Sequence, residues 1–90
     1  MDQLLKDKVS IITGGCSWMG KAGVELFSKS GGQIVIADIN EKAGIELENK
    51  LKNLNFLVKF IKTDVTNTKN VQNTINEVVN KYGKIDILFH

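Results

Sequence analysis

Residues 9–20 read VSIITGGCSWMG, and they carry the clearest sign of the fold. Its start, Val9–Ile12, is a short β-branched apolar run, which is typical of a buried strand. The run ends at Thr13-Gly14-Gly15. Apolar residues then recur at helical spacing, at Met19, Ala22, Leu26 and Phe27. The stretch therefore predicts a strand, a glycine-rich turn and a helix, in that order.

The same alternation continues downstream of this helix. Gly31-Gly32 ends the helix, and a second apolar run at Ile34–Ala37 leads to Asp38. Asn40 is placed to cap a helix that runs from Glu41 to about Asn53. The apolar stripe expected on that helix is Ile45, Leu47, Leu51 and Leu54.

A third strand is predicted over Phe56–Ile61, just before Asp64-Val65. The helix that follows should begin at a cap formed by Asn67 or Thr68 and end at Gly83. Its apolar face comprises Val71, Ile75, Val78, Val79 and Tyr82. A last strand is predicted over Ile85–Phe89.

The resulting order is βαβαβαβ, which predicts parallel strands joined by right-handed crossovers. Nearly continuous apolar strands agree with a sheet that is covered on both faces. We therefore expect an α/β fold with a Rossmann-type doubly wound parallel sheet, truncated to the strand order 3-2-1-4. Residues 1–90 would form the N-terminal part of one dinucleotide-binding domain.

Composition excludes several classes of function. The 90 residues are 42% hydrophobic and 24% charged, with a net charge of +2, as in soluble globular proteins. No apolar run approaches the roughly 20 residues of a membrane span, and the start lacks a secretory signal. The lysines alternate with acids, which does not favour a nucleic-acid patch. A cytoplasmic protein without membrane or nucleic-acid partners is expected, and a single cysteine excludes an intrachain disulfide.

The carboxyl ends of the strands should hold the functional site. A glycine-rich turn there lets the backbone approach a pyrophosphate, and the helix N-terminus adds N–H donors. Asp38 follows Gly14 by 24 residues, and a carboxylate there accepts ribose hydroxyls and repels a 2′-phosphate. The turn carries no basic residue, which favours NAD over NADP. Taken singly, the turn also fits a tight connection without a ligand, and Asp38 fits a cap or a surface acid.

Residues 13–20, TGGCSWMG, resemble the Thr-Gly-x-x-x-Gly-x-Gly turn of the short-chain dehydrogenase/reductase family. Asp38 matches that family's NAD-selecting acid, and Asp64-Val65 looks like its adenine-contacting pair. Residues 82–88 are similar to the segment that leads into the family's Asn-Asn-Ala-Gly motif. The resemblance implies that the cofactor is NAD. It implies a cofactor-binding set comprising Gly14, Ser17, Met19, Gly20, Asp38, Asp64 and Val65.

Two positions depart from the family pattern. Trp18 replaces the middle glycine, so its indole either points outward, packs on the first helix or occupies cofactor space. His90 falls where the first Asn of Asn-Asn-Ala-Gly would stand, so the family's catalytic Ser and Tyr-x-x-x-Lys have no counterpart among these residues. Tyr82 and Lys84 have a different spacing, and we expect Tyr82 to pack in the core. Cys16 has no base near it in sequence and is expected to serve as a small turn residue.

The resemblance implies the NAD-binding part of an oxidoreductase that transfers hydride between NAD(H) and a small-molecule alcohol or carbonyl substrate. It also implies a homo-oligomer for the full-length enzyme. The alternatives are a catalytically inactive dinucleotide-binding module and a truncated fragment with no function of its own. An Asn-Ala-Gly continuation followed by Tyr-x-x-x-Lys would favour the enzyme.

Overall fold

The computed structural model describes residues 5–14, 16 and 18–89, with residues 18–21 described by their backbone alone. All the expected elements are present along the chain. They are β1 (Val9–Thr13), α1 (Trp18–Lys29), β2 (Gln33–Asp38), α2 (Glu41–Asn53), β3 (Val58–Lys62), α3 (Thr68–Tyr82) and β4 (Ile87–Phe89). The last two strands begin two residues later than predicted. At β3 the reason is that the Phe56 amide donates to the Leu51 carbonyl (3.0 Å), in the turn after α2.

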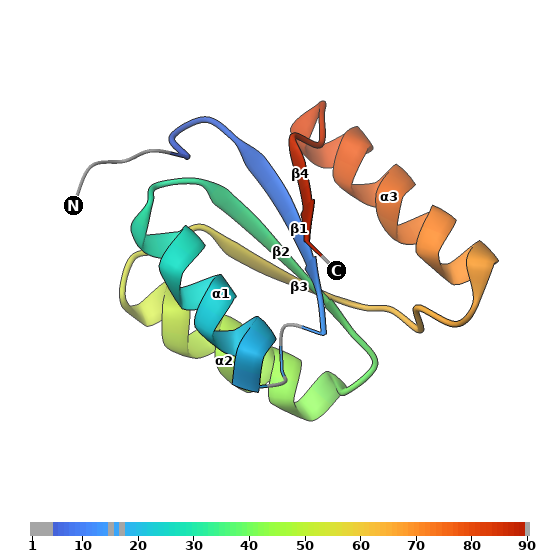
Figure 1. Cartoon of the computed structure of the whole chain (residues 1–90), viewed down its shortest axis with the longest axis horizontal. Coiled ribbons are helices and arrows are strands. Elements are labelled where there is room, and N and C mark those ends of the chain that lie inside the picture. Colours follow the sequence, from blue (N-terminus) through green and yellow to red (C-terminus); the bar gives the residue numbers. More distant parts are fainter. Residues whose placement is uncertain (1–4, 15, 17, 90) are drawn as a thin grey trace.

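The four strands form one parallel sheet in the order β3-β2-β1-β4, as predicted (Figure 1). Thr13 is in register with Ala37, and Asp38 is in register with Lys62. The carboxyl ends of β1, β2 and β3 therefore meet at one edge of the sheet. The turns that follow them are the places where a doubly wound sheet binds its ligands.

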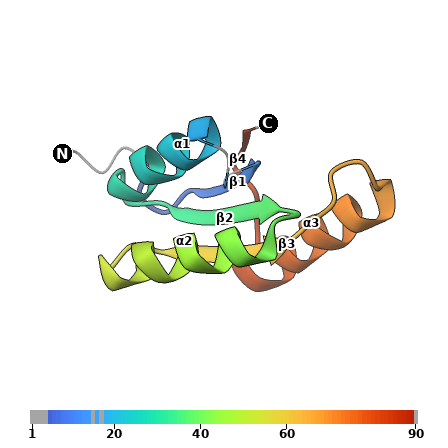
Figure 2. The ribbon, with the colours of Figure 1, turned by 90° about the horizontal axis from the view of Figure 1, so that it is seen from below.

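Alternate side chains of the sheet enter two separate apolar cores. One core joins Ile12, Ile34 and Ile36 to α1 and α2, and these two helices run alongside β2 (Figure 2). The other core joins Ile11 and Val35 to α3. The period of two along β1 and β2 thus separates the helices between the two faces, as the strand order requires.

The buried faces of two helices differ from the predicted stripes. On α1, Leu26 is 52% exposed and Ala22 is exposed, whereas Val24 and Ser28 are buried. Ile45 of α2 is exposed, and so is Leu54, which caps the end of that helix. The residues of α2 that are buried are Gly44, Leu47 and Leu51. Ser28 and Gly44 therefore lie on the packed faces of these helices. The pattern of apolar residues does not predict their burial.

The predicted helix caps are confirmed. The Asn40 side chain accepts the Ala43 amide at the start of α2, and the Asn67 side chain accepts the Asn70 amide at the start of α3. Gly83 ends α3 with φ +83°, a left-handed conformation that favours glycine. On α3, Thr74 and Val78 are buried while Val79 is 42% exposed, so the packed face is narrower than predicted.

The two edge strands differ in how they are covered. The Ile34 amide donates to the Leu57 carbonyl, and the Thr63 amide donates to the Asp38 carbonyl, so the odd-numbered residues of β3 bond to β2. Because alternate residues of a strand face opposite sides, the Phe60 amide points away from β2. Glu48 of α2 accepts that outward amide. At the other edge, Leu88 and Phe89 of β4 are 61% and 39% exposed.

The helices described here are all too short or too polar to cross a membrane.

Candidate functional site

A cleft of about 300 Å³ lies at the carboxyl edge of the sheet. Its lining residues come from the turns after β1, β2 and β3: Gly14, Ala37, Asp38, Ile39, Thr63, Asp64, Val65 and Thr66. Four of the residues predicted for cofactor binding, Gly14, Asp38, Asp64 and Val65, thus line one cavity although they are far apart in sequence. The parallel register of β1, β2 and β3 brings them together.

Asp38 holds both neighbouring turns. Its Oδ1 accepts the Asn40 amide at 2.8 Å, and its Oδ2 accepts the Cys16 amide at 3.1 Å. The bond to Asn40 closes the turn after β2, and the cap of α2 is Asn40 rather than Asp38. Each carboxylate oxygen can accept two hydrogen bonds, so these contacts leave acceptor capacity for hydroxyl groups of a ligand.

Asp64 is fixed by the loop between β3 and α3. Its Oδ1 accepts the Thr66 hydroxyl at 2.6 Å and the Thr66 amide at 3.0 Å, and its own amide donates to Asn70 Oδ1 at 2.6 Å. The hydrogen bond from the Thr66 hydroxyl, followed by that from the amide, lowers the pKa of Asp64 below its usual value. The cleft therefore carries an ionised carboxylate at neutral pH.

Two aliphatic side chains line the cleft near these carboxylates. Ile39 is 60% exposed and Val65 is 45% exposed, so both offer apolar surface to solvent. Val65 was predicted for the site and Ile39 was not. The position of Ile39, directly after the acid that ends β2, could have indicated this exposure, because an apolar residue there lies beyond the buried sheet.

The glycine-rich turn is described in part. Gly14 has φ +66°, where a side chain would be strained, and its amide donates to the Ala37 carbonyl at 3.0 Å. The backbones of Met19 and Gly20 lie in the first turn of α1, which carries no acidic residue. Ser17 lies outside the described residues, and so does the indole of Trp18, so their predicted roles stay predictions.

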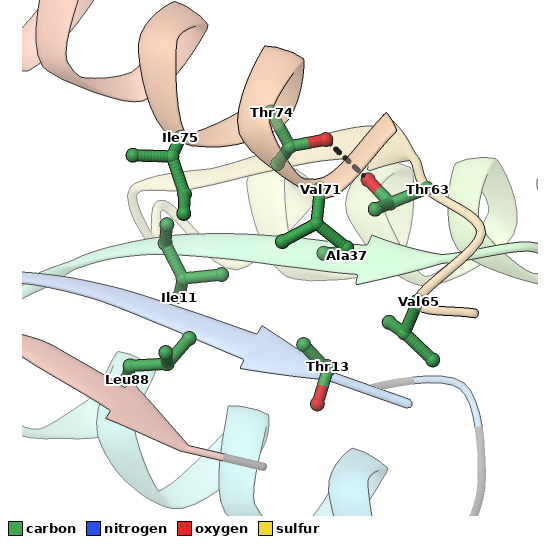
Figure 3. Close-up of a pocket in the computed structure, with 9 residues that line it drawn as sticks. All are labelled: Ile11, Thr13, Ala37, Thr63, Val65, Val71, Thr74, Ile75 and Leu88. Atoms are coloured by element: carbon green, nitrogen blue, oxygen red, sulfur yellow. Dashed lines mark hydrogen bonds between the residues drawn. The ribbon is translucent and has the colours of Figure 1, made fainter. Parts of the chain in front are cut away.

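Figure 3 shows the residues that line a second cavity, of about 150 Å³. It shares Ala37, Thr63 and Val65 with the cleft and extends between α3 and the sheet. Its other lining residues are Ile11, Thr13, Val71, Thr74, Ile75 and Leu88. Its polar groups include the paired hydroxyls of Thr63 and Thr74, 2.7 Å apart. This lining suits apolar packing and supplies no acid or base for chemistry.

The residues doubted as catalytic groups have structural contacts. Tyr82 packs against the core under α3, and its burial, followed by the charges of Glu48 and Glu77, raises its pKa. Lys84 forms an ion pair with Asp86 at 3.2 Å. Cys16 packs against the core under α1 and α2, as expected of a small turn residue. Among the described residues no cluster suited to a metal ion occurs, and His90 lies outside them.

Known proteins share this sequence and this fold. The model of the short chain dehydrogenase family matches residues 8–90. An uncharacterized oxidoreductase of Thermotoga maritima is 40% identical over 85 residues, which cover 94% of this chain and 33% of that protein. Tropinone reductase-like 1 of Erythroxylum coca is 41% identical over 86 residues, covering 96% of this chain and 30% of that protein.

Among solved structures, a short-chain dehydrogenase/reductase from Burkholderia phymatum in complex with NAD has a TM-score of 0.90 at 30% sequence identity. The match covers 94% of this chain and 30% of that one. The chain thus spans about a third of the length of the curated relatives it matches. Because the family model covers nearly all of the sequence, the chain belongs to the short-chain dehydrogenase/reductase family.

Proposed function

We propose that residues 1–90 are the NAD-binding N-terminal part of an oxidoreductase that transfers hydride between NAD(H) and an alcohol or carbonyl substrate. The observation that carries this proposal is the cleft in which Gly14, Asp38, Asp64 and Val65 meet. A cytoplasmic location and a homo-oligomeric full-length protein belong to the same proposal. The NAD complex of the Burkholderia phymatum relative supports the cofactor class.

The adenosine half of NAD fits the character of the cleft. An adenine ring needs apolar contact surface, which Ile39 and Val65 offer, and an acceptor for its exocyclic amine, which the ionised Asp64 carboxylate offers. The Val65 backbone would add a contact to the ring. The ribose needs acceptors for two hydroxyl groups, and the Asp38 oxygens retain capacity for them.

The pyrophosphate half would be held at the start of α1. Gly14, Ser17, Met19 and Gly20 are the residues proposed for this role, since helix N-terminal amides favour anions and no acid opposes them in the first turn. Bound NAD supplies the hydride acceptor, while this chain supplies binding and orientation. Tyr82 packs against the core under α3 and is given no part in proton transfer.

A catalytically inactive dinucleotide-binding module is the second candidate. Tyr82 and Lys84 do not have the spacing of the family's Tyr-x-x-x-Lys pair, and Tyr82 packs against the core under α3, so neither residue is assigned proton transfer here. The two candidates share the same cofactor site. They differ in whether proton-transfer groups are provided elsewhere in the protein.

Calorimetric titration with NAD and NADP tests the proposal. We expect NAD to bind about tenfold or more tightly than NADP, because a charged hydrogen bond contributes about 1.5–3 kcal/mol and Asp38 repels a 2′-phosphate. Asp38→Ala should narrow this difference, whereas Glu77→Ala, on the outer side of α3, should not. Equal affinities for the two cofactors, or no binding of either, would contradict the proposal.

A further inference from the structure

The Asp38 carboxylate lies where the hydrogen-bond ladder between β1 and β2 ends. The last backbone bond of that ladder runs from the Gly14 amide to the Ala37 carbonyl, at 3.0 Å. A further hydrogen bond between these two turns comes from the backbone amide of Cys16, which lies beyond the end of β1. That amide bonds to Asp38 Oδ2 at 3.1 Å.

The backbone of β2 cannot supply this bond itself. The Asp38 carbonyl accepts the Thr63 amide at 2.9 Å, on the side of β3. The following residues turn away into α2, and the turn is closed by the Asn40 amide on Asp38 Oδ1 at 2.8 Å. The side chain of Asp38 therefore ties the turns after β1 and β2 to each other.

A second contact joins the same two turns. The Cys16 thiol lies 4.0 Å from the Asn40 carbonyl, and Cys16 also packs against the core under α1 and α2. The position of Cys16 is thus defined by its amide and by its side chain. Of these contacts, the bond to the Asp38 carboxylate involves a charge and is the stronger one.

The geometry points to a positioning role for Asp38: its carboxylate fixes the glycine-rich turn at Cys16 before any dinucleotide binds. This role goes beyond ribose recognition, because the bond joins two parts of the chain itself. If the proposed function holds, one carboxylate serves both parts of the site, and losing it disturbs the phosphate side as well as the ribose side. A preformed turn lowers the ordering cost of binding.

Amide hydrogen exchange, followed by NMR on the ligand-free chain, tests this role without any cofactor. In Asp38→Ala we expect the Cys16 amide to exchange about tenfold faster or more, since hydrogen bonds to charged groups contribute about that factor. The Asn40 amide should also exchange faster. Asp38→Asn, which keeps one carbonyl oxygen as an acceptor, should restore part of the protection.

Two internal references separate positioning from general destabilisation. The Ile34 amide, bonded to Leu57 at 2.9 Å within the core, reports opening of the sheet. The Thr66 amide, bonded to Asp64 Oδ1 at 3.0 Å, is a similar carboxylate–amide bond in the neighbouring loop. Both should exchange at the parent rate in Asp38→Ala. The matched variant Asp64→Ala should accelerate Thr66 and leave Cys16 unchanged.

The outcomes are distinct from those of the cofactor titration. Unchanged exchange at Cys16 in Asp38→Ala overturns the positioning role, even if NAD binds. An equal acceleration at Cys16 and Ile34 also overturns it, because Asp38 then stabilises the whole sheet and not the turn. Local acceleration at Cys16 in a chain that binds no NAD supports the positioning role and refutes the proposed function.

Discussion

Gly44 offers a sharp test of how α2 packs on the sheet. A Cβ added there would lie 2.1 Å from Phe60 Cε1 and 2.3 Å from its Cδ1, far inside van der Waals contact. Phe60 belongs to the core under α1 and α2 and is 9% exposed, so its ring has little room to move. Gly44 is therefore a close contact between helix and sheet.

The expected effect of Gly44→Ala is the sum of two opposed contributions. Alanine is favoured over glycine inside a helix by about 1 kcal/mol. Overpacking of a filled core costs about 1–3 kcal/mol. With the middle of that range, the free energy of unfolding should fall by about 1 kcal/mol, which lowers the Tm of a domain of this size by about 4–8 °C.

Gly23 in α1 provides the matched control. A Cβ added there meets nothing within 4 Å, so Gly23→Ala should gain the helix contribution alone, up to about 1 kcal/mol. Thermal and urea unfolding, followed by circular dichroism, measure both variants. A Gly44→Ala variant as stable as Gly23→Ala would refute the packing of α2 against Phe60.

Three further predictions concern other parts of the chain. Asp86 accepts the Val9 amide at 2.8 Å, and this hydrogen bond, followed by the neighbouring Lys84, lowers the pKa of Asp86. The carboxylate should therefore stabilise the fold above about pH 4, and this stabilisation should be lost as the pH falls through the lowered pKa. Acid titration of Asp86→Asn should not show this loss. Trp18→Gly should strengthen NAD binding in calorimetry, because it restores the family's small residue; an unchanged Kd would mean that the indole is no obstacle. Leu88→Lys should reduce self-association in light scattering, since β4 is an apolar edge; a parent chain that is already monomeric at micromolar concentration would contradict this.

The helix ends could be predicted from the sequence because their signals are local, whereas the strand order followed from the alternation of strands and helices. Asn40, Asn67 and Gly83 act as caps through bonds to residues a few positions away. The orientation of the helices could not be read in the same way. Ser28 and Gly44 are buried because of what the sheet presents to them, and this depends on tertiary contacts.

The site was predictable to the extent that it follows from topology. Parallel strands end at one edge, so Asp38 and Asp64 were expected to meet there, and they line the same cleft. Ile39 was missed, because its exposure becomes evident only once the chain turns away from the sheet. The bond from Cys16 to Asp38 was also missed, since residue spacing does not specify hydrogen-bond geometry.

The most direct test of the central claim is a map of amide chemical shifts on adding NAD to the isotope-labelled chain. We expect the largest changes at Gly14, Asp38, Ile39, Asp64 and Val65, which line the cleft. The amide chemical shifts of Gly32 and Asn55, which line a cavity at the opposite end of the sheet, should not change. Shifts confined to that opposite end, or none at saturating NAD, would contradict the assignment of the cleft as the NAD site.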